Sequence, residues 1–172
     1  MAGQRVLIAY GTKNGGTAGI AETMGEALRS LGLEVDVRDA TEVRDTTGYA
    51  AVVLGGALYM HRWHKDATRF ARRHRRELSG KPVWLFSSGP LDNSAAEGDI
   101  PPVATARRAE TALRARQHRT FGGVLDERAQ GRIARRMVAN GTGGDFRDRD
   151  QITAWATEIG TALQAVAPAE PT

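Results

Sequence analysis

Short apolar runs and amphipathic stretches alternate along this chain. Apolar runs predict strands at residues 5–10, 50–55 and 83–88, and a fifth strand, weakened by glycines, at residues 120–126. Apolar and charged residues alternate at residues 34–39, which predicts an edge strand there. Helical periodicity appears between and after these runs, at residues 17–31, 64–78, 102–116, 131–139 and 148–166. This alternation predicts an α/β fold in which helices cover both faces of a parallel sheet.

Right-handed crossovers would make this sheet doubly wound, so ligands are expected beyond the carboxyl ends of its strands. We expect a single domain over residues 1–166 and a disordered Pro/Ala-rich tail at residues 167–172. Two acidic residues near the last helix, Asp145 and Asp148, are predicted to be N-terminal residues of that helix.

The loop at residues 10–17 (YGTKNGGT) joins the first predicted strand to the first predicted helix. It offers two hydroxyls, an amide and a pair of glycines, from Thr12, Thr17, Asn14, Gly15 and Gly16. Such a loop at a helix N-terminus can hold a phosphate. Thr17 stands where a P-loop needs lysine, and the G-x-G-x-x-G spacing of dinucleotide-binding loops is absent. The alternative is a plain strand–turn–helix corner with capping threonines.

The pattern T-x-x-G-x-T in this loop closely resembles the phosphate loop of the flavodoxin family, which binds flavin mononucleotide (FMN). The likeness covers nearly the whole chain. Four further segments, at residues 54–64 (LGGALYMHRWH), 86–89 (FSSG), 120–123 (TFGG) and 144–148 (GDFRD), are similar to the branch that contains menaquinone-dependent protoporphyrinogen oxidase. The resemblance implies a flavodoxin-like, doubly wound sheet of five parallel strands in the order 2-1-3-4-5.

By the same resemblance, three loops would hold FMN as the cofactor. The phosphate would bind to the first loop, at Thr12, Lys13, Asn14, Gly15, Gly16 and Thr17. The flavin ring would be framed by the second loop, at Gly56, Ala57, Leu58 and Tyr59. The third loop would complete the frame with Ser88, Gly89, Pro90 and Leu91.

Aromatic residues near these loops have two interpretations. Tyr59 and Trp63 are candidates for stacking on the flavin ring, and Trp63 is equally a candidate for the first buried residue of the following helix. Trp84 and Phe86 alternate within a predicted strand, and Trp155 lies on the apolar face of the last helix. These three are predicted core residues.

The four histidines suggest no metal site, because neither cysteines nor an acidic cluster would supply a third ligand to His61 and His64. A proton-relay role beside the flavin and a simple surface role are both open for this pair. His74 and His118 fall in arginine-rich segments and are predicted to be solvated.

Composition narrows the function classes. The absence of cysteine excludes disulfides, Fe–S ligation and a cysteine nucleophile. The net charge is +4 and the pI is about 9.9, with arginines clustered at residues 69–76 and 107–119. These basic residues mix with apolar ones at helical spacing and lack interleaved aromatics, which favours solvated helix faces over a nucleic-acid site. A positive field suits an anionic small-molecule substrate or an acidic redox partner.

The chain shows no signal-peptide pattern and no apolar run long enough to span a bilayer. We therefore expect a cytoplasmic protein and leave peripheral membrane association open. The leading hypothesis is an FMN-dependent oxidoreductase that acts on protoporphyrinogen or a quinone. The alternatives are an electron-transfer carrier with no substrate of its own, and a non-redox binding module that has kept the fold.

Overall fold

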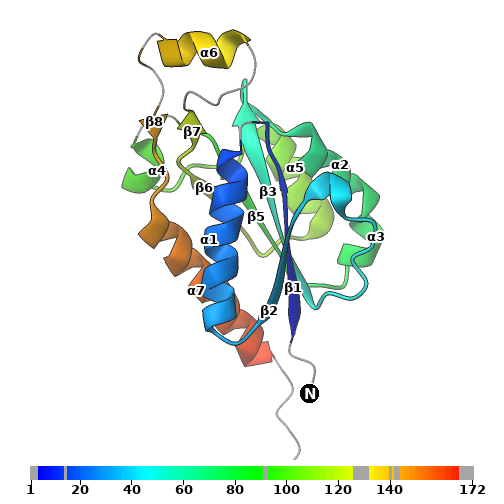
Figure 1. The fold of residues 1–172 in the computed structure, drawn as a ribbon. Helices are drawn as coiled ribbons and strands as arrows, with labels where there is room; N and C mark the ends of the chain where they lie inside the picture. The colour runs from blue at the N-terminus through cyan, green and yellow to red at the C-terminus, as the bar shows by residue number, and fades with distance from the viewer. Residues whose placement is uncertain are drawn as a thin grey trace, which may run out of the picture.

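The fold centres on a parallel sheet in the order β2-β1-β3-β5-β6 (Figure 1). The computed structural model describes residues 4–13, 15–90, 93–125, 132–139, 141 and 144–166. The five strands are β1 (Arg5–Gly11), β2 (Glu34–Asp39), β3 (Ala51–Tyr59), β5 (Val83–Ser88) and β6 (Gln117–Phe121). All their pairings are parallel. Counted along the chain, these five strands have the predicted order 2-1-3-4-5, and the predicted α/β fold is confirmed.

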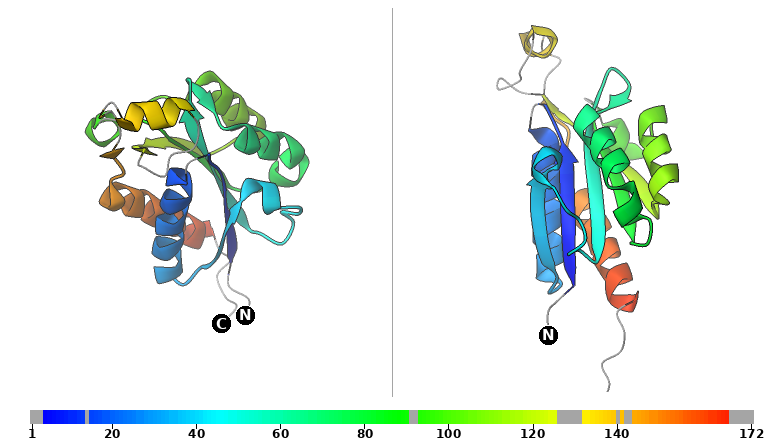
Figure 2. Two further views of the ribbon diagram at one scale, coloured as in Figure 1. Left: turned by 45° about the horizontal axis from the view of Figure 1, so that its top comes forward. Right: turned by 90° about the vertical axis from the view of Figure 1, so that its right-hand side faces the viewer.

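Helices cover both faces of this sheet (Figures 1 and 2). One face carries α1 (Gly16–Ser30) and α7 (Arg149–Val166), and the other carries α2 (Lys65–Arg73), α3 (Arg75–Leu78) and α5 (Ala104–Leu113). Each layer has its own apolar core. Met24 and Trp155 belong to the first core, while Phe70 and Leu85 belong to the second. The side chains of Trp84, Phe86 and Trp155 are all buried, as predicted.

Short elements complete the chain, most of them near the carboxyl edge of the sheet (Figure 2). They are η1 (Ala40–Glu42), β4 (Arg62–Trp63), α4 (Ser94–Glu97), β7 (Val124–Leu125), α6 (Arg132–Ala139) and β8 (Gly144–Asp145). The hairpin of β3 with β4, the helix α4 and the ribbon of β7 with β8 were not predicted. None of the helices in the described ranges is long and apolar enough to cross a membrane.

The fifth strand differs from its prediction at both ends. It begins at Gln117 and ends at Phe121, where the backbone of Gly122 lies so close to the carbonyl of Phe146 that a Cβ would overlap it. Gly122 therefore ends the strand, because only a residue without a side chain fits against the chain that crosses at Phe146. The predicted tail at residues 167–172 lies outside the described residues, and the expected single domain stays a prediction.

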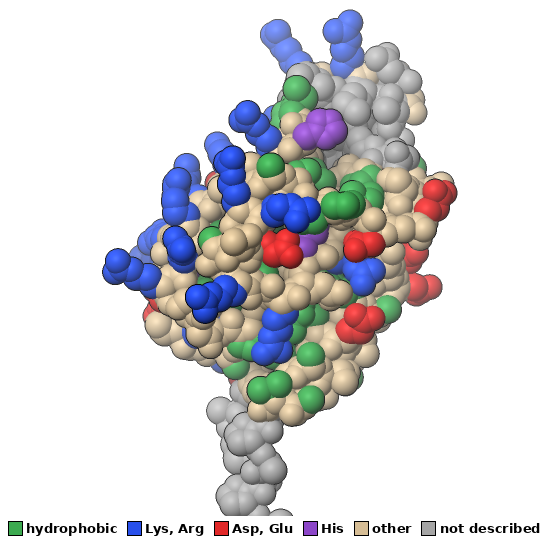
Figure 3. Space-filling model, turned by 180° about the vertical axis from the view of Figure 1, so that it is seen from behind, with side chains coloured by type: hydrophobic (Ala, Val, Ile, Leu, Met, Phe, Trp, Pro, Cys, Tyr) green, Lys and Arg blue, Asp and Glu red, His purple; other side chains and the backbone are tan. Residues whose placement is uncertain are grey.

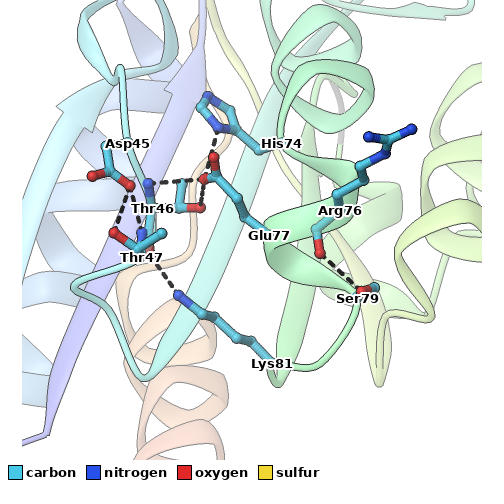
Figure 4. A network of polar contacts seen from close by, with 8 residues as sticks. All are labelled: Asp45, Thr46, Thr47, His74, Arg76, Glu77, Ser79 and Lys81. Carbon is cyan, nitrogen blue, oxygen red and sulfur yellow. Dashed lines mark hydrogen bonds and ion pairs between the residues drawn. The ribbon is translucent and has the colours of Figure 1, made fainter.

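The prediction that His74 and His118 are solvated is wrong, since both side chains are buried. His74 ends α2, packs on the ring of Phe70 at 4.5 Å between centroids, and lies 3.3 Å from the carboxylate of Glu77 (Figure 4). Glu77 in turn accepts hydrogen bonds from the backbone and hydroxyl of Thr46. These bonds hold the pKa of Glu77 below its usual value. The network joins α3 to the loop before β3.

Candidate functional site

The first predicted loop forms an open cradle between β1 and α1. Gly15 is the N-cap of α1 with a left-handed φ of 84°, and among the described residues no side chain caps this helix. The hydroxyl of Thr12 accepts a hydrogen bond of 3.0 Å from the backbone N–H of Gly15, and a Cβ on Gly15 would meet open space. The first-turn N–H groups are thus available to an anion, which the helix dipole also favours. Asn14, predicted for the same role, lies outside the described residues.

The end of this loop is tied to the third predicted loop. Thr17 is buried, and its hydroxyl donates a 3.3 Å hydrogen bond to the hydroxyl of Ser88. Gly16 is also buried, and a Cβ there would lie 2.5 Å from a methyl group of Val124. The structure therefore brings together two loops that lie 71 residues apart in the sequence. A contact of Thr17 with phosphate stays a prediction.

The second predicted loop is a tight hairpin between β3 and β4. Its two turn residues, Met60 and His61, are left-handed with φ values of 52° and 58°. Such turns favour Asn and Gly, so this tip is strained. Gly56 is buried against the indole of Trp63, whereas Tyr59 is 44% exposed. Ala57 and Leu58 are half-buried between them.

Trp63 is a core residue and does not stack at the hairpin surface. It is 3% exposed, and its indole N–H donates to the backbone carbonyl of Phe86 at 3.2 Å. Of the two aromatic candidates for stacking, Tyr59 is the one that stays accessible. The Nζ atom of Lys13 lies 5.3 Å from the centre of the Tyr59 ring, so the first and second loops also meet.

The third predicted loop lies against the second. A Cβ on Gly89 would lie 2.6 Å from the Cβ of Leu58, so the two loops can approach closely because Gly89 has no side chain. The N–H of Gly89 donates to the carbonyl of Phe121, and the carbonyl of Pro90 accepts from the N–H of Gly123. Both anchors come from the end of β6. Leu91, also predicted here, lies outside the described residues.

Histidines near the hairpin have separate surroundings. The Nδ1 atom of His64 accepts a 3.2 Å hydrogen bond from the N–H of Asp66, so His64 caps α2. His61 is exposed at the hairpin tip. In the part of the chain that the structure describes, no group of three His, Asp or Glu side chains could hold a metal ion.

Sequence reasoning missed a residue at the rim of the first loop. Arg147 follows β8, and its Nη1 atom lies 3.4 Å from the carbonyl of Gly16. Asp145, predicted to begin the last helix, instead binds the guanidinium of Arg147, whose hydrogen bonds lower the pKa of Asp145. Asp148 does have the predicted role, because its carboxylate accepts from the N–H of Gln151 at 3.1 Å. No local pattern could have revealed a contact across 131 residues.

Comparison with known proteins identifies the class. A family model described as "Flavodoxin domain" matches residues 7–146, and the chain belongs to this family. Protoporphyrinogen IX dehydrogenase (quinone) of Escherichia coli strain K12 is 26% identical over 85 residues, which are 48% of this chain and 47% of that protein. The match thus spans about half the length of this curated relative.

Solved structures agree on the fold. A flavodoxin from the domain Archaea has a TM-score of 0.63 at 12% identity, and a mutant flavodoxin from Pseudomonas aeruginosa has a TM-score of 0.63 at 16% identity. Each comparison covers 94% of this chain and 99% of the other. At such identities the likeness concerns the fold alone.

FMN, the predicted cofactor, is the cofactor of the flavodoxin family. The residues described here fit it. The N-terminus of α1, which no described side chain caps, and its open glycine suit a terminal phosphate, and Thr12 and Lys13 lie beside them. The adjoining second and third loops, with Tyr59 exposed and Pro90 half-buried, suit the edge of a flat ring.

Proposed function

We propose that this protein is an FMN-dependent oxidoreductase that acts on protoporphyrinogen or a quinone. The observation that carries the proposal is the meeting of the three loops at the carboxyl edge of the sheet, through the contact of Thr17 with Ser88 and of Lys13 with Tyr59. Bound FMN supplies reversible electron transfer. The protein supplies the phosphate cradle at Gly15 and a rigid frame for the ring.

The similarity to protoporphyrinogen IX dehydrogenase supports the substrate class, within the half of each chain that it covers. The surroundings of the ring loops support it as well. Lys13, His61 and Arg62 are exposed at or beside the hairpin that presents Tyr59. A substrate with carboxylate groups would find the cations of Lys13 and Arg62 at this rim. Crowding of the ring site by aromatic side chains would favour a non-redox module, and Trp63 does not crowd this site because it is buried in the core.

Reconstitution tests this proposal in two stages. The full chain is titrated with FMN, and binding is followed by flavin absorbance and by the melting temperature. The loaded protein is then given protoporphyrinogen IX with a water-soluble quinone under anaerobic conditions, and porphyrin fluorescence is recorded. We expect FMN binding and quinone-dependent porphyrin formation. If saturating FMN changes neither absorbance nor melting temperature, the redox proposal fails and the non-redox module is favoured.

A variant separates the role of the ring loops from unspecific flavin chemistry. Tyr59→Leu removes the exposed aromatic ring while keeping an apolar side chain at the hairpin. We expect slower porphyrin formation and weaker FMN binding, whereas Val166→Ala, at the exposed end of α7, serves as the matched surface control. Equal rates for all three proteins would contradict a ring site at this hairpin. A cytoplasmic location is part of the proposal, and cell fractionation tests it.

An electron-transfer carrier is the second candidate, because charge is strongly segregated on the molecule. Residues 62–81 and 104–119, which include α2, α3 and α5, hold 13 of the 24 Lys and Arg but only three of the 20 Asp and Glu. Figure 3 shows Lys and Arg side chains gathered over one side of the molecule. The rest of the chain has 11 basic and 17 acidic residues, so its charge has the opposite sign. A basic face of this kind favours an acidic protein partner.

Ionic strength and charge reversal test the carrier proposal. The rate at which an acidic ferredoxin reduces the FMN-loaded chain is measured from 20 mM to 500 mM salt, a range chosen to span strong and weak screening (roughly 20 to 4 Å). We expect the rate to fall with salt and to fall further in Arg72→Glu. Arg29→Glu, on α1 in the opposite layer, carries the same charge change as a control. A salt-independent rate, or equal losses in both variants, would count against the basic face.

A further inference from the structure

A guanidinium rests against the first turn of α1. The Nη1 atom of Arg147 lies 3.4 Å from the carbonyl oxygen of Gly16. The same nitrogen occupies the space in which Gly19 would carry a side chain, because a Cβ added to Gly19 would overlap it. Gly19 therefore provides a seat for Arg147 on the surface of the helix. This seat lies within one turn of the open end of α1.

Asp145 fixes the orientation of this guanidinium. One carboxylate oxygen accepts from Nε at 2.9 Å and from the backbone N–H of Arg147 at 3.1 Å, and the other accepts from Nη2 at 2.7 Å. Such bidentate pairing holds the planar group in one geometry. The side chain of Arg147 is 29% exposed and that of Asp145 is 51% exposed. Water therefore screens the carboxylate more than it screens the cation, and the Nη1 edge of the pair faces α1.

The ribbon that carries Arg147 touches the first loop at a second point. Val124 of β7 pairs with Asp145 of β8, and a methyl group of Val124 packs on Gly16. The N–H of Phe146 donates to the carbonyl of Gly123 at 2.9 Å, which anchors the same segment to the end of β6. The position of Arg147 is thus set by backbone pairing and by packing, as well as by its ion pair.

We propose that Arg147 is a positioning residue for the terminal phosphate of the cofactor. Its guanidinium holds the Gly16 carbonyl and so fixes the first turn of α1, whose N–H groups receive the phosphate. It also places a positive charge beside the loop at residues 10–17, whose own sequence contains one cation, Lys13. The inference rests on the proposed FMN site and adds a residue that the T-x-x-G-x-T pattern does not contain.

The test compares FMN with riboflavin, which has the same ring and no phosphate. Affinities of the full chain for both are measured by quenching of flavin fluorescence, together with the melting temperature. Arg147→Met removes the charge while keeping a long side chain. We expect FMN to bind about tenfold more weakly and riboflavin to bind unchanged, because the variant loses both the charge-assisted contact that fixes the Gly16 carbonyl and the positive charge near the phosphate. Arg147→Lys should recover part of the FMN affinity.

Two further variants separate position from charge. Gly19→Ala fills the seat and displaces the guanidinium while the net charge stays the same, so it should reproduce the loss of FMN affinity. Arg149→Met is the matched control, because Arg149 pairs with Glu26 at 2.6 Å on the surface and is 72% exposed. It removes one positive charge two residues away, and both affinities should stay as in the unmodified protein.

Other outcomes overturn the inference. If Arg147→Met lowers the affinities for FMN and riboflavin equally, Arg147 only stabilises the local structure. If the affinity for FMN is unchanged, Arg147 has no role in binding. If the unmodified chain binds neither flavin, the proposed function fails, and inorganic phosphate then serves as the probe. Thermal stabilisation by phosphate that Arg147→Met abolishes would still support an anion-positioning role. Stabilisation that is equal in both proteins, or absent from both, would overturn it.

Discussion

Acid should destabilise this protein through one buried histidine. His118 lies on β6, is 8% exposed, and has its Nε2 atom 2.8 Å from the hydroxyl of Ser87. Its Nδ1 atom has no hydrogen-bond partner within the described ranges. Burial lowers the pKa of His118 from 6.5 to about 4, with Asp99 raising it and Arg107 lowering it by smaller amounts. The imidazole is therefore neutral in the folded protein at neutral pH.

The sign and size of the effect follow from linkage. Below pH 6.5 the unfolded chain takes up a proton at His118, whereas the folded protein does so only near pH 4. The free energy of unfolding thus decreases as the pH falls through this window and shows no further change from His118 below it. A pKa difference of this size corresponds to about 3 kcal/mol, which is a large part of the stability of a typical domain.

Urea unfolding at pH 7, 6, 5 and 4 measures this loss. His118→Gln removes the titrating group, and we expect it to lose about 3 kcal/mol less than the unmodified protein between pH 7 and pH 4. Carboxylates with lowered pKa values, such as Asp36 and Asp145, also lose stabilisation in acid, but they act alike in both proteins. The difference between the two curves isolates His118. Parallel curves would refute the reasoning, as would an NMR titration that places the pKa of His118 near 6.5.

Three further changes test the site and its supports. Replacing Met60 by Asn and His61 by Gly should raise the free energy of unfolding by about 1 kcal/mol or more, since these residues suit a left-handed turn; a loss in chemical denaturation would contradict the turn geometry. Gly56→Ala should lower the free energy of unfolding by about 1–3 kcal/mol, because the added methyl group overlaps the buried indole of Trp63. Gly80→Ala, where the methyl group meets open space, should lower it far less. Thr17→Val should weaken FMN binding about tenfold and spare riboflavin, as fluorescence titration would show; equal affinities for FMN would exclude the hydroxyl from the phosphate site.

The sheet was predictable because its strands have clear local patterns. The alternating residues 34–39 and the apolar residues 83–88 gave β2 and β5 with their observed ends. β3 was predicted to end at Gly55, yet it continues to Tyr59. Gly55 lies under the ring of Phe86, and the next glycine lies under an indole. Close approaches of this kind depend on tertiary packing, which a local pattern does not contain.

The histidines show where a helical pattern misleads. The predicted helix at residues 102–116 ends at Leu113, and Arg114 follows with a left-handed φ of 52°. Glycine is the usual residue at such a position, so the sequence lacks the signal that would have ended the helix. His118 therefore lies on β6, beside β5, with a buried side chain, and not on a solvated helix face. The contact of Arg147 with Gly16 could not be predicted from a local pattern either, because the two residues lie 131 positions apart in the sequence.

The three loops of the proposed flavin site are coupled to one another, because a single segment holds two of them. Gly123 donates to the carbonyl of Pro90 in the third loop and accepts from Phe146, whose neighbour Arg147 rests on the first turn of α1. The hydrogen bond from Thr17 to Ser88 links the first loop directly to the third. A cradle fixed in this way loses little conformational freedom when a ligand binds, so its donors are preorganised. It follows that substitutions in the first and third loops should give non-additive losses of FMN affinity.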